Sequence, residues 1–320
     1  MVRSLWSAAT GMRAQQTNVD NIANNVANVN TLGYKSKKAE FKSLLYQTLQ
    51  TESTNNAGEN KPIPAQVGTG TRIASITSSY AQGNLVASDN PYSVAIEGTG
   101  FFKVRRANGE IGYTRDGNLK LSPQQDGNHL VSSDGHAILD QNNNPIIIPG
   151  SATMRGSDGN VIRDSANQAV QFELLVNKMT IDTDGSIYID TKGSGVDSAT
   201  GAKIELTDYG VNDPTYRLTN IANNQEYNVT IGMVQFNNPQ GLTEVGGNVL
   251  AESPVSGAPM EETATEGLTS SKIHQYYIEG SNVQVADEIV NLIVAQRAYE
   301  MNSKMIQTTD DMMQQANNLR

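Results

Sequence analysis

The chain has 320 residues, a formal net charge of −10 and no cysteine, and 37% of its residues are hydrophobic. The acidic balance argues against nucleic acid as a partner, because phosphate binding requires a basic face. Without cysteine, disulfides, thiolate chemistry and cysteine-based metal sites are excluded.

Long apolar runs are missing from the sequence. The first six residues lead into a polar amphipathic stretch, whereas a cleavable secretory signal needs an unbroken apolar run. No run of about 18 apolar residues occurs, so no membrane insertion is expected. The sequence therefore predicts either a cytoplasmic protein or one exported by a route that reads an uncleaved N-terminus.

A heptad pattern predicts a helix over residues 4–29. Gln15 interrupts the pattern, and Gly33 can adopt the left-handed geometry of a helix stop. Such a seam, apolar at two positions of seven, must be buried against another helix. Its apolar positions are Leu5, Met12, Val19 and Val26, with Ala8, Ile22 and Val29 three positions later.

A second heptad pattern predicts a helix over residues 283–318, roughly 50 Å long at 1.5 Å per residue. Its natural partner is the N-terminal helix of the same chain. The alternative is that each helix packs separately on the central domain. The apolar positions are Val285, Leu292, Tyr299, Ile306 and Met313, with Ile289 and Ala295 beside them.

Asparagines form a stripe beside the first seam. Asn18, Asn21, Asn25 and Asn28 follow a 3-4-3 spacing, which places them on one helical face. Asparagine is a mediocre helix former but offers an uncharged donor and acceptor. The stripe therefore indicates a surface that becomes buried on assembly. The plainer interpretation is a solvated face of low charge.

The middle of the chain has two parts. Residues 36–80 predict a connector, and its polar stretch at 51–61, which cannot hold a core, by itself favours a flexible linker. Residues 81–274 predict a β-rich domain, because short apolar strands alternate with Asn-Gly and Asp-Gly turns. The domain division is thus 1–35 with 275–320, then 36–80, then 81–274.

The sequence shows no catalytic or metal-binding pattern. His129, His136 and His274 have no partner at ligand spacing, so surface positions are expected for them. Residues 182–185 resemble the start of a calcium loop without its closing Glu, which favours a turn. No catalytic residue, cofactor or metal ligand is predicted, and the sequence disfavours an enzyme.

Three separated blocks resemble the flagellar rod and hook proteins: residues 21–35, residues 95–102 with 113–118, and residues 281–304. The resemblance covers both ends of the chain and the first half of the middle. Residues 150–228 are longer than the outer domain that is usual in this family, which implies insertions around 150–228 within the β-rich domain. Residues 41–49 and the polar stretch up to residue 70 resemble the long connector of rod proteins in this family. The resemblance implies that residues 36–80 form an extended connector, a wall element ordered by neighbouring subunits. Hook proteins commonly have a shorter one, so the resemblance favours a rod subunit.

The resemblance implies an α+β subunit of a helical tube. Two long terminal helices would pair as a coiled-coil-like unit lining the tube, with the β-rich domain outside. It also implies a rod that transmits torque to the hook in the flagellar basal body. The implied partners are the chain itself as a homopolymer, other rod and hook subunits, the flagellar type III export apparatus, and bushing rings around the rod.

We therefore predict a subunit interface and keep two alternatives. Within the family, the chain would be a proximal rod or hook-type subunit. Outside it, the chain would be a soluble coiled-coil binding or adaptor module. The predicted interface consists of Leu5, Met12, Asn18, Val19, Asn21, Ile22, Asn25, Val26, Asn28, Val285, Ile289, Leu292, Tyr299, Ile306 and Met313.

Overall fold

The computed structural model describes residues 2–50, 65–154, 161–163, 168–196, 203–205, 215–222, 225–262, 265 and 267–318. The chain divides into two units. The terminal-helix unit comprises Met1–Asn30, Lys35–Ser79 and Asn282–Arg320, and the central unit comprises Thr31–Tyr34 and Tyr80–Ser281.

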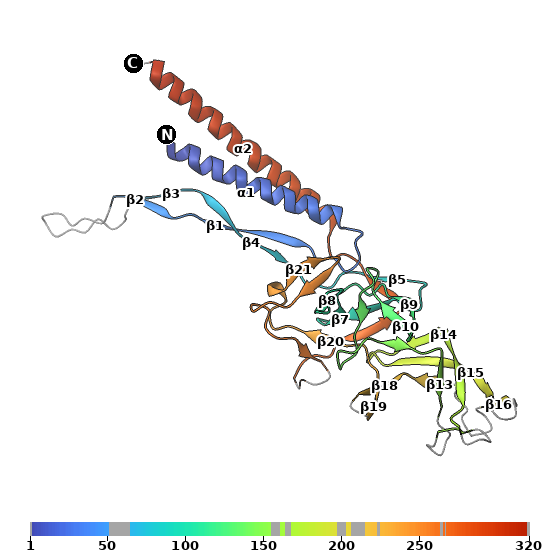
Figure 1. The fold of residues 1–320 in the computed structure, drawn as a ribbon. Helices are drawn as coiled ribbons and strands as arrows, with labels where there is room; N and C mark the ends of the chain where they lie inside the picture. Colours follow the sequence, from blue (N-terminus) through green and yellow to red (C-terminus); the bar gives the residue numbers. More distant parts are fainter. Residues whose placement is uncertain are drawn as a thin grey trace. The chain divides into compact units, whose positions relative to one another are not determined.

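Two long antiparallel helices dominate the terminal-helix unit, and they lie side by side (Figure 1). The predicted terminal helices are confirmed, within about two residues at each end. The second helix carries Asp287 and Glu288 in its first turn, where negative charge favours the helix dipole. The elements of this unit are α1 (Val2–Ala27), β1 (Lys37–Ser43), β2 (Tyr46–Gln50), β3 (Ala65–Gly68), β4 (Thr71–Ser78) and α2 (Val285–Asn318).

The predicted connector is not separate from the helices. Antiparallel β1 and β4 pair over their whole length, with a bulge between Glu40 and Phe41, and both strands contact α1. The described part of residues 36–79 therefore belongs to the terminal-helix unit. Sequence patterns missed this because the docking depends on hydrogen bonds from α1 rather than on an apolar strand face. The predicted polar stretch at 51–61 lies outside the described residues.

The central unit is rich in β-strands, as predicted. In its described part a ten-stranded sheet has the order β12-β10-β11-β7-β8-β22-β21, with β9, β20 and β23 paired beside this path. These strands are β7 (Phe101–Arg105), β8 (Ile111–Thr114), β9 (Lys120–Gln124), β10 (Gly127–Val131), β11 (Ala137–Ile138), β12 (Ile147–Ile148), β20 (Met233–Gln235), β21 (Thr243–Gly246), β22 (Val249–Ala251) and β23 (Met260–Glu261).

The region that the sequence marked as insertions, around 150–228, contains a second sheet and a hairpin. Long β14 and β15 pair antiparallel, and β13, β16 and β17 join them. Gly193 and Gly195 lie inside β15, whereas residues 156–159 lie outside the described part. The elements are β13 (Ser151–Thr153), β14 (Gln171–Ile181), β15 (Ile187–Val196), β16 (Lys203–Glu205), β17 (Thr215–Arg217), β18 (Thr219–Ala222) and β19 (Gln225–Asn228).

Residues on either side of the predicted boundaries change unit. The segment 275–281 belongs to the central unit, because β24 pairs with β6 and β25 pairs with β5. Residues 31–34 belong there as well. The remaining elements are β5 (Leu85–Ala87), β6 (Val94–Glu97), the short 3-10 helix η2 (Pro239–Gly241), β24 (Lys272–Gln275) and β25 (Tyr277–Glu279).

The central unit has one large core that includes side chains from both sheets, among them Phe102, Leu130 and Ile187. A smaller aromatic cluster joins Phe101, Tyr113 and Phe236 through edge-to-face contacts. Burial of aromatic and branched side chains on this scale supplies most of the folding free energy of a β domain.

Gly117 allows β6 to approach closely. The Val94 amide donates to the Gly117 carbonyl at 2.9 Å, and a Cβ at Gly117 would collide with the Val94 carbonyl oxygen. We expect Gly117→Ala to lower the free energy of unfolding of the central unit by about 3 kcal/mol, measured by urea unfolding. Gly150→Ala is the control, since a Cβ there meets no atom within 4 Å. Equal unfolding curves for the two variants would contradict the expected clash.

Candidate subunit interface

One side of α2 is covered by α1. The buried residues of α2 are Ala295 and Thr309. Leu292, Ile306 and Met313 are half-buried. These positions lie 14 and 7 residues apart, multiples of the seven-residue repeat of a seam between two helices.

Polar and small residues contribute to the same helix pair. A Cβ added to Gly11 of α1 would lie 2.9 Å from the Asn302 Nδ2 of α2, so the helices come close there. Farther along, Asn25 Nδ2 donates to Glu288 Oε1 at 3.0 Å. The face of α1 toward α2 is therefore not a purely apolar seam.

The predicted seam residues of α1 are all at least half-buried. Ala8 and Ile22 are buried, and the others are intermediate. On α2 the prediction divides: Val285, Ile289 and Tyr299 remain exposed, at 39%, 49% and 42%. The half-buried set comprises Leu5, Met12, Val19 and Val26 on α1.

The asparagine stripe makes hydrogen bonds within the single chain. Asn21 and Asn25 are buried, and each donates through Nδ2 to the Lys37 carbonyl at 2.8 Å. The Lys37 amide donates back to Asn25 Oδ1 at 2.9 Å. The amides of α1 thus hold the first strand of the β1–β4 ribbon. Asn18 and Asn28 are half-buried, and Asn28 donates to the Asn24 carbonyl. Contact of this stripe with a second copy stays a prediction.

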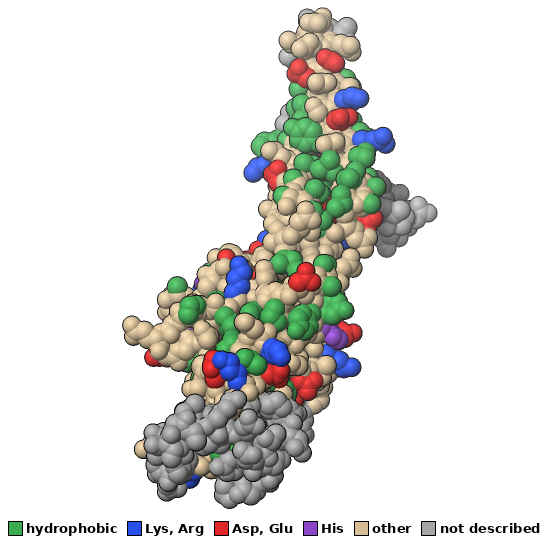
Figure 2. Space-filling view, turned by 90° about the vertical axis from the view of Figure 1, so that its right-hand side faces the viewer, with side chains coloured by type: hydrophobic (Ala, Val, Ile, Leu, Met, Phe, Trp, Pro, Cys, Tyr) green, Lys and Arg blue, Asp and Glu red, His purple; other side chains and the backbone are tan. Residues whose placement is uncertain are grey.

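A second apolar stripe, which the sequence analysis did not identify, lies on a face of α2 that remains exposed. We call it the α2 stripe; it consists of Val290, Val294, Met301, Met305 and Met312, which are 52–62% exposed. Figure 2 shows hydrophobic side chains gathered along the helical unit. The 4-7-4-7 spacing places all five on one helical face. The sequence analysis predicted this helix from another heptad set, which begins at Val285, and so gave no reason to look for a second stripe.

The β-ribbon also exposes apolar side chains. We call Phe41, Leu45, Tyr46, Leu49 and Val67 the ribbon patch; all are exposed, Leu45 at 87%. In the described part of the chain β2 and β3 pair only with each other. An isolated two-stranded hairpin is marginally stable in water, so a partner surface is expected for it.

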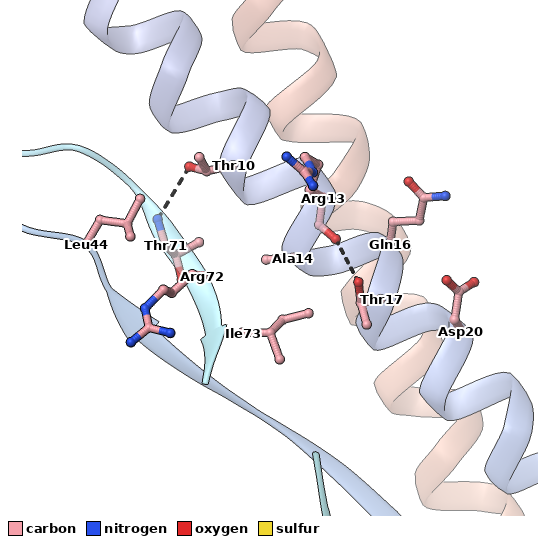
Figure 3. Close-up of a pocket in the computed structure, with 10 residues that line it drawn as sticks. All are labelled: Thr10, Arg13, Ala14, Gln16, Thr17, Asp20, Leu44, Thr71, Arg72 and Ile73. Carbon is pink, nitrogen blue, oxygen red and sulfur yellow. Dashed lines mark hydrogen bonds between the residues drawn. The ribbon is translucent and has the colours of Figure 1, made fainter. Parts of the chain in front are cut away.

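A groove separates α1 from the ribbon. Figure 3 shows Thr10 and Ala14 of α1 beside Thr71 and Ile73 of β4. The Thr71 amide donates to Thr10 Oγ1 at 3.4 Å. At Gly70, φ is +120° and a Cβ would collide with Thr10 Oγ1, so glycine permits this approach. The complete lining is Thr10, Arg13, Ala14, Gln16, Thr17, Asp20, Leu44, Thr71, Arg72 and Ile73.

The groove holds no arrangement typical of catalysis. Arg13, Arg72 and Asp20 are its charged groups, and all three side chains are exposed. Among the described residues, no group of three or more histidine and carboxylate side chains is placed to hold a metal ion. Also within that part of the chain, neither helix carries a stretch apolar enough to cross a bilayer.

The histidines differ from their predicted surface positions in one case. His129 is buried in β10, whereas His274 bonds Glu97 at 2.7 Å near the surface. Through that hydrogen bond, His274 holds the pKa of Glu97 below its usual range. His129 was misassigned because a single polar residue in a short strand does not reveal which face it occupies.

Asn25 provides a direct test of how the helix holds the ribbon. We expect Asn25→Ala to weaken the docking of β1 by about 1–3 kcal/mol, because the Lys37 amide and carbonyl each lose a partner. Amide hydrogen exchange at Lys37 measures this loss. Asn30→Ala is the control, since Asn30 is exposed at the end of the unit. Unchanged Lys37 exchange in the Asn25 variant would show that the strand is held by other contacts.

Comparison with known proteins adds three family matches. The profile described as "Flagella basal body rod protein" matches residues 5–35. The "Flagellar hook protein FlgE/F/G D1 domain" matches 95–189, and the "Flagellar basal body rod FlgEFG protein C-terminal" matches 274–319. These matches cover the first helix, part of the central unit and the last helix.

Whole-chain relatives are similar over their full length. The flagellar basal-body rod protein FlgG of Borreliella burgdorferi is 36% identical over 100% of this chain and 99% of its own. That of Buchnera aphidicola subsp. Schizaphis graminum is 35% identical over 100% of both. Among solved structures, the Helicobacter pylori flagellar hook protein FlgE2 matches 68% of this chain and 47% of its own, at 16% identity and a TM-score of 0.19.

Proposed function

The chain belongs to the family of flagellar rod and hook proteins, and from this we propose that it is a structural subunit of the distal basal-body rod. Copies of the chain assemble into a rigid tubular drive shaft that transmits torque to the hook. Full-length similarity to FlgG rod proteins supports the rod over the hook.

The observation that carries the assembly proposal is the α2 stripe. Five large apolar side chains on one helical face are costly to leave in water, and burial of each stabilises by about 1.5–3 kcal/mol. Their heptad-like spacing fits a helix as the covering partner. In the proposed tube, the α2 stripe of one copy packs against the helices of the next.

The terminal-helix unit offers two different apolar surfaces, the α2 stripe and the ribbon patch. When two unlike surfaces bind each other, each added copy leaves one surface of each kind free for the next copy. Such contacts produce a ring if the rotation between neighbouring copies closes, and an open helical polymer if it does not. A single self-complementary patch would instead produce a closed dimer. Two unlike surfaces on one unit therefore favour a growing tube.

The interface residues predicted from sequence take two roles in this proposal. Leu292, Ile306 and Met313 of α2, with the seam of α1, hold the chain's own coiled-coil-like pair. The exposed Val285 and Ile289 contact neighbouring copies, as does Tyr299. The outer domain, including the sheet of β13–β17, forms the wall of the tube.

We extend the proposal to location and partners. The chain would reach the periplasmic rod through the flagellar type III export apparatus with its N-terminus uncleaved. It would contact other rod and hook subunits and bushing rings around the rod. A proximal rod or hook-type role is the alternative within the family. Electron microscopy of basal bodies that carry a labelled chain distinguishes these roles by the position of the label.

The dependence of polymer size on protein concentration distinguishes a rod subunit from a soluble adaptor. We expect sedimentation to show polymers that grow with protein concentration, because the α2 stripe gains burial only between copies. In dilute solution the C-terminal half of α2 should exchange its amides quickly, and in polymers slowly. A compact monomer at all concentrations, with both helices fully protected, would favour the adaptor.

Charged substitutions on α2 distinguish the role of the α2 stripe from the role of the face that contacts α1. We expect Val294→Glu to prevent polymerisation while the chain's helix pair remains, because a carboxylate would be buried between copies. Leu292→Asp should also prevent polymerisation, because it disrupts the pair of α1 and α2 itself. Circular dichroism should then show a loss of helical signal. In both variants the central unit should stay folded.

Gln296→Glu is the matched control, since it adds the same charge to an exposed position of α2 outside the stripe. Electron microscopy scores the polymers. Normal tubes from Val294→Glu would show that the stripe is not an interface.

A further inference from the structure

Lys103 is a buried lysine in a middle strand of the ten-stranded sheet of the central unit. It lies in β7, which pairs with β8, β11 and β20, and it is only 2% exposed. Lysine is rarely buried to this extent unless its ammonium group is paired. A Cβ added to Gly232 would collide with Lys103 Cε, so glycine leaves open the space that the lysine side chain occupies. The fold therefore holds this amine in one place.

The Lys103 amine contacts three oxygen acceptors there. Nζ donates to the Gln141 carbonyl at 3.0 Å, to Asn143 Oδ1 at 2.8 Å and to Glu261 Oε1 at 3.0 Å. Gln141 and Asn143 lie in the turn that follows β11, whereas Glu261 lies in β23. Three acceptors match the three N–H donors of an ammonium group. The plainer interpretation is therefore a buried cation with its hydrogen bonds satisfied.

The chemical identity of these groups allows a covalent reaction as well. A lysine amine is a nucleophile toward carbonyl carbon. Asn143 Cγ is bonded to the same Oδ1 that accepts from Nζ, so the amine lies next to the carbon that it would attack. A carboxylate on the same nitrogen, here that of Glu261, can take a proton from the amine and later give it to the leaving group. Reacting groups held together in this way gain a large rate advantage from proximity.

The turn that carries Asn143 is itself held by several hydrogen bonds. Asn143 has φ +63°, a left-handed conformation that asparagine tolerates better than most residues. Asp140 Oδ1 accepts from the amides of Asn142 and Asn144, both at 2.8 Å. Arg105 donates to the Asn143 carbonyl at 2.6 Å. Because its backbone is fixed, Asn143 loses little further freedom when its amide approaches the amine.

We propose that Lys103 and Asn143 form an intramolecular isopeptide bond, with Glu261 as the proton carrier. The Lys103 ammonium gives one proton to the Glu261 carboxylate, and the lone pair of Nζ forms a bond to Asn143 Cγ. The Cγ–Nδ2 bond breaks, and Nδ2 leaves as ammonia with a second proton from Nζ. Glu261 then gives its proton to the ammonia. A lysine ammonium and an asparagine amide thus become a secondary amide and an ammonium ion, so the reaction consumes no oxidant or reductant.

The bond ties β7 covalently to the turn after β11, across 40 positions of the sequence. A cross-link stabilises a fold mainly because it restricts the unfolded chain, as a disulfide does. This chain has no cysteine, so a disulfide is not available to it. All three residues belong to the central unit, and the proposal holds whether or not the chain forms a rod.

Intact-mass spectrometry of the folded full-length chain tests the bond. We expect the chain to be lighter than its sequence by one molecule of ammonia. Digestion should then give two peptides joined through Lys103 and Asn143. A folded chain that keeps the full mass of its sequence would overturn the proposal and leave Lys103 as a hydrogen-bonded cation.

Three variants identify the participating atoms. Lys103→Arg keeps the positive charge but has no amine, so it should keep the full mass. Glu261→Gln keeps an acceptor oxygen but cannot carry the proton, so it should lose ammonia at least about a hundred-fold more slowly, and an unchanged rate would overturn the role of Glu261. Lys192→Arg is the matched control: Lys192 pairs with Glu173 at the surface, and this variant should lose ammonia as the unmodified chain does. Circular dichroism checks that each variant is folded.

A different reaction with the same mass change must be separated from this one. An asparagine followed by glycine loses ammonia when it closes to a succinimide, and the sequence contains one such pair, Asn108 and Gly109. Asn108→Ala, on an exposed turn, should leave the loss of ammonia unchanged, and it decides the question even if Lys103→Arg does not fold. A loss of ammonia that disappears in Asn108→Ala would belong to that turn and would overturn the proposal.

Discussion

A helix as long as α2 has two sides, and the described part of the chain covers only one of them. Helix α1 is shorter by eight residues, 26 against 34, and contacts a single face of its partner. Outside this contact, α2 carries large apolar side chains that remain exposed. The two units differ in the same way: the buried hydrophobic clusters of the described residues lie in the central unit, and none of them lies in the terminal-helix unit.

The two units therefore reach stability by different means. The central unit buries aromatic and branched side chains between its strands, which is sufficient for a domain of its size. The terminal-helix unit has few buried apolar residues in its described part and relies on amide side chains that satisfy backbone groups of a two-stranded ribbon. Such contacts specify geometry well but contribute only about 1 kcal/mol each. Apolar contact with further copies would supply what the unit lacks.

Sequence reasoning recovered what depends on periodicity. Both helices, the turn at Asp182–Gly185 and the β-rich middle followed from heptads, alternation and turn residues. It failed where the deciding interactions are long-range. The bonding of Asn25 to Lys37 could not be read from a 3-4-3 stripe, because the acceptor lies on a strand whose position only the fold reveals. For the same reason, the grouping of residues 31–34 with the central unit depends on Glu279, far along the chain.

The contacts between α1 and the ribbon have a consequence for the environments in which the unit can exist. Asn21 bonds a backbone carbonyl and Thr10 accepts from a backbone amide, so neither contact involves a formal charge. Mobile ions screen charged pairs at the surface but have little to act on in a neutral amide contact. The attachment of the ribbon to α1 should therefore depend little on the ionic strength of the solution.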